Sequence, residues 1–479
     1  MVSKLDRVTS DVPGLDQVLC GGLVAGSSYI LQGQPGAGKT ILANQIAFGR
    51  ARQNERVLYV TLLAESQDRL FQSLSTLDFF DRAQVGTNLM YMSLFSTLRD
   101  SGLTALVSAL RREMSRHGCT MLILDGLLNA RDRGDTNLDI KSFVAEIQGH
   151  TAFSNCTVLF LTSAYIDESS PEHTMVDGVI QLQSEDWGAR TFKHIRIAKS
   201  RGSAAISGLH QYEINKSGLV IYPRIESLML SAEIPNNFDP DELQRIATGV
   251  GGLDDCIGGG LSHSSITLLL GPSGSGKTTF GLNFALQATD QEPALFLSFY
   301  ESPTRIAMKA KALGFDVAKL VNAGHLRIMG FPITEHLNDQ VFENLLETIA
   351  VRGVKRLVID GIAAFAKGAL QPERLPAFLA AVINELRARG VTTIVTQEAP
   401  NGSEWDANPP IIELPSMLDN LILLRRREQD GKMLRLLWPL KFRDSWHTDD
   451  VQMCGIGKGG FFLLKNGEPL SHRSPSIPT

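Results

Sequence analysis

The chain has 479 residues, of which 43% are hydrophobic and 20% are charged, and its mean hydropathy is close to zero. This length allows two or three domains with separate cores. The composition is that of neither a disordered nor a membrane-embedded chain. A formal net charge of −5 does not favour a protein whose main task is to bind nucleic-acid phosphates.

The first residues contain no apolar stretch suited to a signal peptide, so the sequence predicts a cytoplasmic location without membrane attachment. The cysteines are scattered and form no CxxC pair. This spacing favours buried, reduced thiols over a disulfide framework or a structural zinc site. The cysteines are Cys20, Cys119, Cys156, Cys256 and Cys454.

The first motif is "GQPGAGKT", which follows the apolar run "SSYIL" and precedes a helical stretch. Gly33, Gly36 and Gly38 let the backbone curl so that its N–H groups face phosphate oxygens at a helix N-terminus. Lys39 supplies a mobile cation for the β and γ phosphates, and Thr40 places a hydroxyl on magnesium. The alternative is a flexible glycine turn, but the strand, loop and helix context favours a site for ATP and Mg²⁺.

The same motif returns as "GPSGSGKT", 238 residues later. "PGLDQVLCGGL" and "GGLDDCIGGGL" recur at the same offset upstream of the two loops. The period is too long for a solenoid, so each copy is a whole domain. We expect domains at residues 1–231 and 244–479, joined by a linker at 232–243. The second ATP-binding set is Gly271, Gly274, Gly276, Lys277 and Thr278.

Apolar runs separated by helical stretches predict an α/β fold in each copy, with a mostly parallel sheet flanked by helices. The runs "TMLILD" and "RLVID" end on Asp125 and Asp360. A carboxylate at this strand end would lie beside the magnesium ion. A strand-ending aspartate before glycine is often only a turn former, but the upstream glycine loop in both copies favours the metal role.

Glu65 and Glu301 follow the first strand after the glycine loop in each copy, which is "RVLYVTLL" or "ALFLSF". A carboxylate there could orient and deprotonate the attacking water, so we predict these two glutamates as the catalytic bases. The competing interpretation is a solvated loop glutamate.

Two short basic motifs, "KSRGS" and "KFRDS", also repeat. Each places two cations near a strand end, Lys199 with Arg201 and Lys441 with Arg443. They are either a solvated basic edge or trans-acting groups that reach a neighbouring subunit's γ-phosphate, as an arginine finger does.

Together these segments resemble the KaiC family of tandem RecA-like ATPases. The resemblance covers nearly the whole chain and rests on "GLDxxLxGGL", the two glycine loops, "LILDG", "LVIDG", "KSRGS" and "KFRDSWH". It implies two tandem RecA-like P-loop NTPase domains and a homohexamer of two stacked rings, with ATP at subunit interfaces. It also implies that Lys199, Arg201, Lys441 and Arg443 act across those interfaces.

The sequence departs from the clock protein of that family in three places. A single glutamate stands in each copy where that protein has two adjacent ones. The adjacent serine–threonine phosphoacceptors fall here near Pro415 and Ser416, and the long regulatory tail is largely missing after Lys441. We therefore predict a KaiC-like signalling or timing ATPase with an unidentified protein partner. Weak autokinase activity on Ser416 is a further hypothesis, and its alternative is that Ser416 caps a helix or turn.

A RecA-like DNA-dependent ATPase in recombination or repair is the competing function. Arg131, Arg133 and the run at residues 425–427 favour it. DNA channels need basic and aromatic loops, whereas the segments at residues 163–178 and 398–414 carry acids and no Lys or Arg. The acidic loops make DNA an unlikely partner.

Overall fold

Each apolar run predicted to be a strand forms one in the computed structural model. The structure describes residues 5–63, 67–126, 137–163, 171–187, 190–228, 244–331, 337–367, 372–399, 417–465 and 468–469. The chain divides into two compact units, residues 1–227 and 228–479. The linker predicted at residues 232–243 lies outside the described residues. Across the described part of the chain, no helix combines the length and apolar character needed to cross a bilayer.

The described residues of the first unit contain a nine-stranded sheet in the order β5-β4-β6-β7-β3-β8-β9-β10-β11. The strands from β5 to β8 in this order are parallel, and the remainder pair as antiparallel hairpins. The strands are β3 (Ser28–Gly33), β4 (Val57–Thr61), β5 (Leu89–Ser93), β6 (Met121–Asp125), β7 (Thr157–Thr162), β8 (Gly178–Trp187), β9 (Arg190–Ser200), β10 (His210–Asn215) and β11 (Gly218–Tyr222). A separate ribbon pairs β1 (Arg7–Val8) with β2 (Leu23–Val24).

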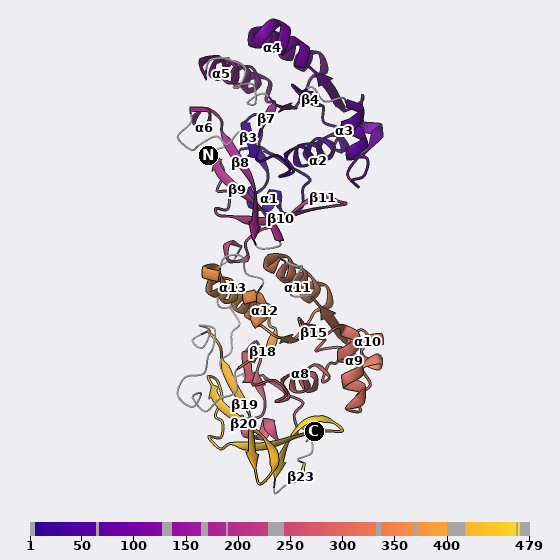
Figure 1. Ribbon diagram of the computed structural model, residues 1–479, viewed down its shortest axis with the longest axis vertical. Coiled ribbons are helices and arrows are strands. Elements are labelled where there is room, and N and C mark those ends of the chain that lie inside the picture. The colour runs from indigo at the N-terminus through magenta and orange to yellow at the C-terminus, as the bar shows by residue number, and fades with distance from the viewer. Residues whose placement is uncertain are drawn as a thin grey trace. The chain divides into compact units, whose positions relative to one another are not determined.

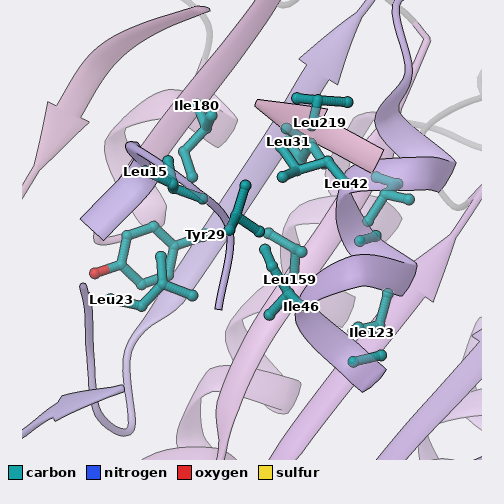
Figure 2. Close-up of a cluster of buried hydrophobic side chains, with 14 of the residues drawn as sticks. Leu15, Leu23, Tyr29, Leu31, Leu42, Ile46, Ile123, Leu159, Ile180 and Leu219 are labelled. Carbon is teal, nitrogen blue, oxygen red and sulfur yellow. The ribbon is translucent and has the colours of Figure 1, made fainter. Parts of the chain in front are cut away.

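Helices cover both faces of this sheet (Figure 1). They are α1 (Leu15–Val18), α2 (Lys39–Arg52), α3 (Gln67–Leu74), α4 (Phe95–His117), α5 (Asn137–Ser154) and α6 (Pro171–Met175). On one face, Leu42 and Ile46 of α2 pack against Leu31 and Leu159 of the sheet (Figure 2). The buried core of the opposite face includes Leu110 of α4 together with side chains of α5. Coverage on both faces explains why the central strands read as continuous apolar runs.

The second unit repeats this topology in the order β16-β15-β17-β18-β14-β19-β20-β21-β22-β23. Its strands are β12 (Arg245–Ile246), β13 (Leu261–Ser262), β14 (Ile266–Gly271), β15 (Ala294–Ser298), β16 (Leu326–Gly330), β17 (Arg356–Asp360), β18 (Thr392–Glu398), β19 (Asn420–Gln429), β20 (Lys432–Phe442), β21 (Gln452–Gly457), β22 (Gly460–Lys465) and β23 (Glu468–Pro469). Its helices are α7 (Leu253–Cys256), α8 (Lys277–Ala285), α9 (Pro303–Ala312), α10 (Val317–Asn322), α11 (Asn338–Arg352), α12 (Ala363–Lys367) and α13 (Leu375–Ala388). The predicted pair of RecA-like α/β domains is confirmed.

The two domains share a β-bulge that the sequence did not reveal. In the β8–β9 hairpin the extra residue is Ala198, and in the β19–β20 hairpin it is Leu440. Each bulge lies directly before a lysine of the repeated basic motif, Lys199 or Lys441. Because an extra residue bends its strand and re-aims the side chains that follow, the bulge sets the direction of the cations at the strand end.

Candidate functional site

The residues predicted to bind nucleotide meet at the carboxyl edge of each sheet. The glycine loop follows β3 in the first domain and β14 in the second, while the aspartate closes β6 or β17. One strand, β7 or β18, separates the loop strand from the aspartate strand. Parallel strands bring these ends to the same edge, so the fold assembles the same set of groups twice.

The glycines of the loop meet two different physical needs. Gly38 and Gly276 have φ values of 93° and 110° and stand directly before α2 and α8. L-residues with side chains rarely adopt this left-handed region. Gly33 is needed for another reason, because a Cβ there would lie 2.5 Å from the carbonyl oxygen of Leu182 on β8. The first glycine thus permits close strand contact rather than the predicted backbone curl.

Both loop lysines fold back onto their own loop. The Nζ of Lys39 donates to the carbonyl oxygens of Gly33 at 2.6 Å and Gln34 at 3.0 Å. Lys277 makes the matching pair of bonds, at 2.7 and 2.8 Å. Burial lowers the pKa of each lysine. The charge of Asp125 opposes this shift at Lys39, and the charges of Glu398 and Asp360 oppose it at Lys277. Two carbonyl oxygens therefore hold each cation against its own glycine loop.

In each domain the hydroxyl of the loop threonine lies against the strand-end aspartate. Thr278 donates to Asp360 at 2.9 Å, and Thr40 approaches Asp125 at 3.4 Å. A hydroxyl oxygen and a carboxylate oxygen suit Mg²⁺, which keeps several waters and takes further ligands from nucleotide phosphates. Among the described residues no group of three or more His, Cys, Asp or Glu forms a complete metal cage. The hydroxyl and carboxylate of each domain therefore fit as two of the ligands of a magnesium ion.

The surroundings of Asp360 also favour a cation. Burial raises the pKa of its carboxyl group, while hydrogen bonds from Thr396 and Thr278 act in the opposite direction. A buried carboxylate is costly to ionise without a nearby positive charge. Thr396 was not recognised from the sequence, since it is one of four polar residues in the run "TTIVTQ".

A cavity of about 320 Å³ lies over the first glycine loop. Its lining includes Gly36, Lys39, Thr40, Asp125 and Ile214. The lining combines polar groups with aliphatic side chains. The cavity has the character of a nucleotide site, which combines phosphate donors with apolar surface.

Glu301 begins the segment that leads into α9, and it is ion-paired. Its Oε1 lies 2.5 Å from the Nζ of Lys309, and its Oε2 lies 4.0 Å from the Nε of Arg305. Ser302 caps α9 by accepting a bond from the backbone N–H of Arg305 at 3.3 Å. Both Glu301 and Lys309 influence the pKa of Asp360 through their charges, so they lie near the predicted metal position. The sequence did not single out Lys309.

The four predicted trans-acting cations contact their own domains. Lys199 donates to the carbonyl oxygens of His173, Thr174 and Val176, at 2.6, 3.2 and 2.6 Å. Lys441 donates to the carbonyl oxygen of Leu418 at 2.7 Å. These bonds hold both lysines against the backbone at the end of their hairpins.

The arginines of the same motifs are more exposed. The side chain of Arg201 is 60% exposed and that of Arg443 is 45% exposed. Their nearest carboxylates, Asp177 and Asp419, lie 3.8 and 4.0 Å away. Arg201 also donates to the carbonyl oxygen of Thr174 at 3.1 Å, so the arginines differ from the lysines in exposure and not in the absence of contacts with their own domain.

Several predicted residues lie outside the described residues. These are the catalytic candidate Glu65, the phosphoacceptor candidate Ser416 and the arginines Arg131 and Arg133. Their roles stay predictions.

The known proteins that this chain resembles agree with the geometry. The family model "ATPase: KaiC" matches residues 8–226 and again residues 246–468. The chain is 24% identical to the circadian clock oscillator protein KaiC of Picosynechococcus sp., over 99% of this chain and 93% of that protein. It is 26% identical to the protein of the same name from Thermostichus vulcanus, over 96% of this chain and 89% of that protein. The two matches fall on the two domains, and the chain belongs to the KaiC family of ATPases.

Proposed function

We propose that both domains bind ATP with Mg²⁺ and hydrolyse it to ADP and phosphate. The observation that carries this proposal is the repetition of one geometry. In each domain the loop lysine rests on two loop carbonyls, and the loop threonine lies within 3.4 Å of the strand-end aspartate. Neither copy has lost a phosphate-binding group, so neither is a relic.

The chain's own groups divide the chemistry between them. Loop N–H groups bind the phosphates, and Lys39 or Lys277 exchanges its carbonyl partners for β and γ phosphate oxygens. Thr40 with Asp125, and Thr278 with Asp360, would hold magnesium, which when bound neutralises the charge on the phosphates. Glu301, and Glu65 in the first domain, would orient the attacking water and accept its proton.

Nucleotide binding and turnover test this function directly. We expect Lys39→Ala and Lys277→Ala each to remove part of the bound nucleotide, and the double variant to remove all of it. Radiolabelled ATP binding and phosphate release measure both effects. A single variant that abolishes all binding while the protein stays folded would contradict two working sites. A strong stimulation of phosphate release by single-stranded DNA would favour the DNA-dependent ATPase instead.

We also propose that the chain forms a homohexamer with ATP at the subunit interfaces. The exposed guanidinium groups of Arg201 and Arg443 support this, because they could complete the phosphate site of a neighbouring copy. Native mass spectrometry of micromolar protein with ATP and Mg²⁺ should give six copies. A strictly monomeric mass under those conditions would contradict the assembly.

The cellular role we propose is a cytoplasmic signalling or timing ATPase that acts on an unidentified protein partner. The relatives' printed name, circadian clock oscillator protein, supports this role. A weaker second activity is autophosphorylation in the second domain with Ser416 as acceptor. Incubation with ATP and Mg²⁺ followed by intact-mass measurement tests it, and a chain that gains no phosphate is an ATPase alone.

A further inference from the structure

Each strand-end aspartate accepts a second side-chain hydroxyl, in addition to that of the loop threonine. In the first domain, Tyr59 donates to Oδ2 of Asp125 at 2.9 Å. In the second domain, Thr396 donates to Oδ1 of Asp360 at 2.7 Å. The two donors come from opposite sides of the aspartate strand. Tyr59 lies on β4, which pairs with β6 on one side, whereas Thr396 lies on β18, which pairs with β17 on the other side.

The residues at the matching positions are exchanged between the domains. Tyr59 pairs in register with Ile123, two residues before Asp125. In the second domain, Phe296 pairs with Val358, two residues before Asp360. Leu161 stands directly beside Asp125, at the position that Thr396 holds beside Asp360. Each domain thus has one hydroxyl donor and one apolar side chain, in opposite places.

We propose that Tyr59 and Thr396 are positioning residues that do the same task in the two ATP sites. This inference rests on the proposed function. The terminal torsion of an aspartate is broad, so a hydroxyl bonded to one oxygen fixes the orientation of the carboxylate that faces the metal. Partners of this kind typically change metal affinity or activity 10- to 100-fold when they are removed.

The two arrangements hold the carboxylate differently. In the first domain Tyr59 and Thr40 both approach the Oδ2 atom, and Thr40 is the more distant at 3.4 Å. In the second domain Thr278 and Thr396 are divided between the two oxygens, at 2.9 and 2.7 Å. The two named hydroxyls thus share one oxygen of Asp125, whereas each oxygen of Asp360 accepts one hydroxyl.

The surroundings of Tyr59 hold its side chain in place. The side chain is 1% exposed. Its ring lies 5.1 Å from that of Tyr91. Tyr91 in turn donates to the Oδ1 of Asn44, whose amide donates to the carbonyl oxygen of Thr40. Tyr59 and the glycine-loop helix are thus fixed to the same group of side chains.

The test measures metal dependence in one site at a time, in the full chain. With Lys277→Ala in place, binding of a fluorescent ATP analogue reports the first domain, and Mg²⁺ is titrated. We expect Tyr59→Phe to raise the half-saturating Mg²⁺ concentration about tenfold. Binding of the analogue in EDTA should stay unchanged. The matched control is Tyr222→Phe, which removes a hydroxyl of the same domain that donates to Glu213 on β10 and should leave the Mg²⁺ dependence unchanged.

A second experiment gives the first domain the hydroxyl position of the second domain and asks whether Mg²⁺ binding recovers. Adding Leu161→Thr to Tyr59→Phe should return the Mg²⁺ dependence most of the way to that of the parent. In the Lys39→Ala background, Thr396→Val should likewise raise the half-saturating Mg²⁺ concentration, and adding Phe296→Tyr should lower it again. The variants Thr396→Val and Phe296→Tyr keep the test valid if the Tyr59→Phe variant does not fold.

The outcomes separate this inference from the function beneath it. If the parent protein binds no nucleotide, the proposed function is wrong and this inference with it. If nucleotide binds but Tyr59→Phe leaves its Mg²⁺ dependence unchanged, the function stands and the positioning role is wrong. A loss that Leu161→Thr does not restore also overturns the inference, because it assigns the effect to the ring packing rather than to the hydroxyl.

Discussion

The Nζ of Lys309 lies 2.5 Å from the Oε1 of Glu301, so the predicted base of the second domain is held by a cation on α9, the helix that follows it. Both side chains are partly exposed, at 34% and 23%. Pairs of this kind contribute about 0.2–1 kcal/mol. Lys309 and an attacking water molecule would therefore compete for the carboxylate of Glu301.

Removal of this ion pair should therefore increase hydrolysis in the second domain. In a Lys39→Ala background, we expect Lys309→Met to raise the rate of phosphate release by up to about fivefold, the equivalent of about 1 kcal/mol. Arg305→Met is the matched control, since Arg305 carries the same charge on α9 but lies 4.0 Å from the glutamate. A slower Lys309→Met enzyme would mean that the lysine binds the nucleotide itself.

Within the first basic motif, the two cations should behave differently on substitution. Lys199→Ala removes three bonds to carbonyl oxygens and should lower the free energy of unfolding by about 1 kcal/mol. Arg201→Ala, at an exposed site, should change it by less than about 0.5 kcal/mol yet weaken ATP-driven hexamer formation. Thermal unfolding and native mass spectrometry measure the two effects. Unaltered assembly of Arg201→Ala would remove this arginine from the interface.

A buried ion pair stabilises the second domain. Both guanidinium Nη atoms of Arg374 bond the carboxylate of Asp339, at 2.7 and 2.6 Å, and the aspartate side chain is 1% exposed. Removing one partner of a buried pair costs about 3–5 kcal/mol, so Arg374→Ala should lower the free energy of unfolding by about 3 kcal/mol. Arg389→Ala breaks the more exposed pair with Glu385 and should cost less than about 1 kcal/mol. Urea unfolding of both variants gives the comparison, and equal losses would contradict it.

Thiol reactivity should report burial. Burial raises the pKa of Cys119 to about 11 and the pKa values of Cys156 and Cys454 to about 12, whereas Cys20 is exposed. The thiolate is the reacting form. At pH 8 a disulfide reagent should therefore modify Cys20 first in the folded protein, and all five cysteines only after unfolding.

The same shifts predict how stability changes in alkali. The folded-state pKa values lie above the ordinary thiol value of 9.0. The stability that the buried thiols contribute is therefore complete below pH 9 and is lost as the pH rises through about 11–12. Urea unfolding measured at pH 8 and at pH 10.5 should show this loss, and Cys156→Ala should make it smaller. A pH dependence that Cys156→Ala leaves unchanged would exclude this thiol as a cause.

The sequence by itself determined the repeated architecture and the phosphate-binding groups. Apolar runs bounded by helical stretches predict a covered parallel sheet, and the glycine loop needs only local backbone geometry and a nearby helix. Lys39, Thr40 and Asp125 could be identified because each has a fixed place relative to a strand end. The tandem offset then identified the second copy.

The tertiary structure decided which side chains surround those groups. Tyr59 and Leu161 lie on strands that follow the first glycine loop by different distances, and their relation to Asp125 exists only once β4, β6 and β7 pair in register. The pairing of Glu301 with Lys309 likewise depends on where α9 begins, which Ser302 fixes as the cap. Register and helix position are set by packing across the whole sheet, so motif spacing carries no information on these contacts.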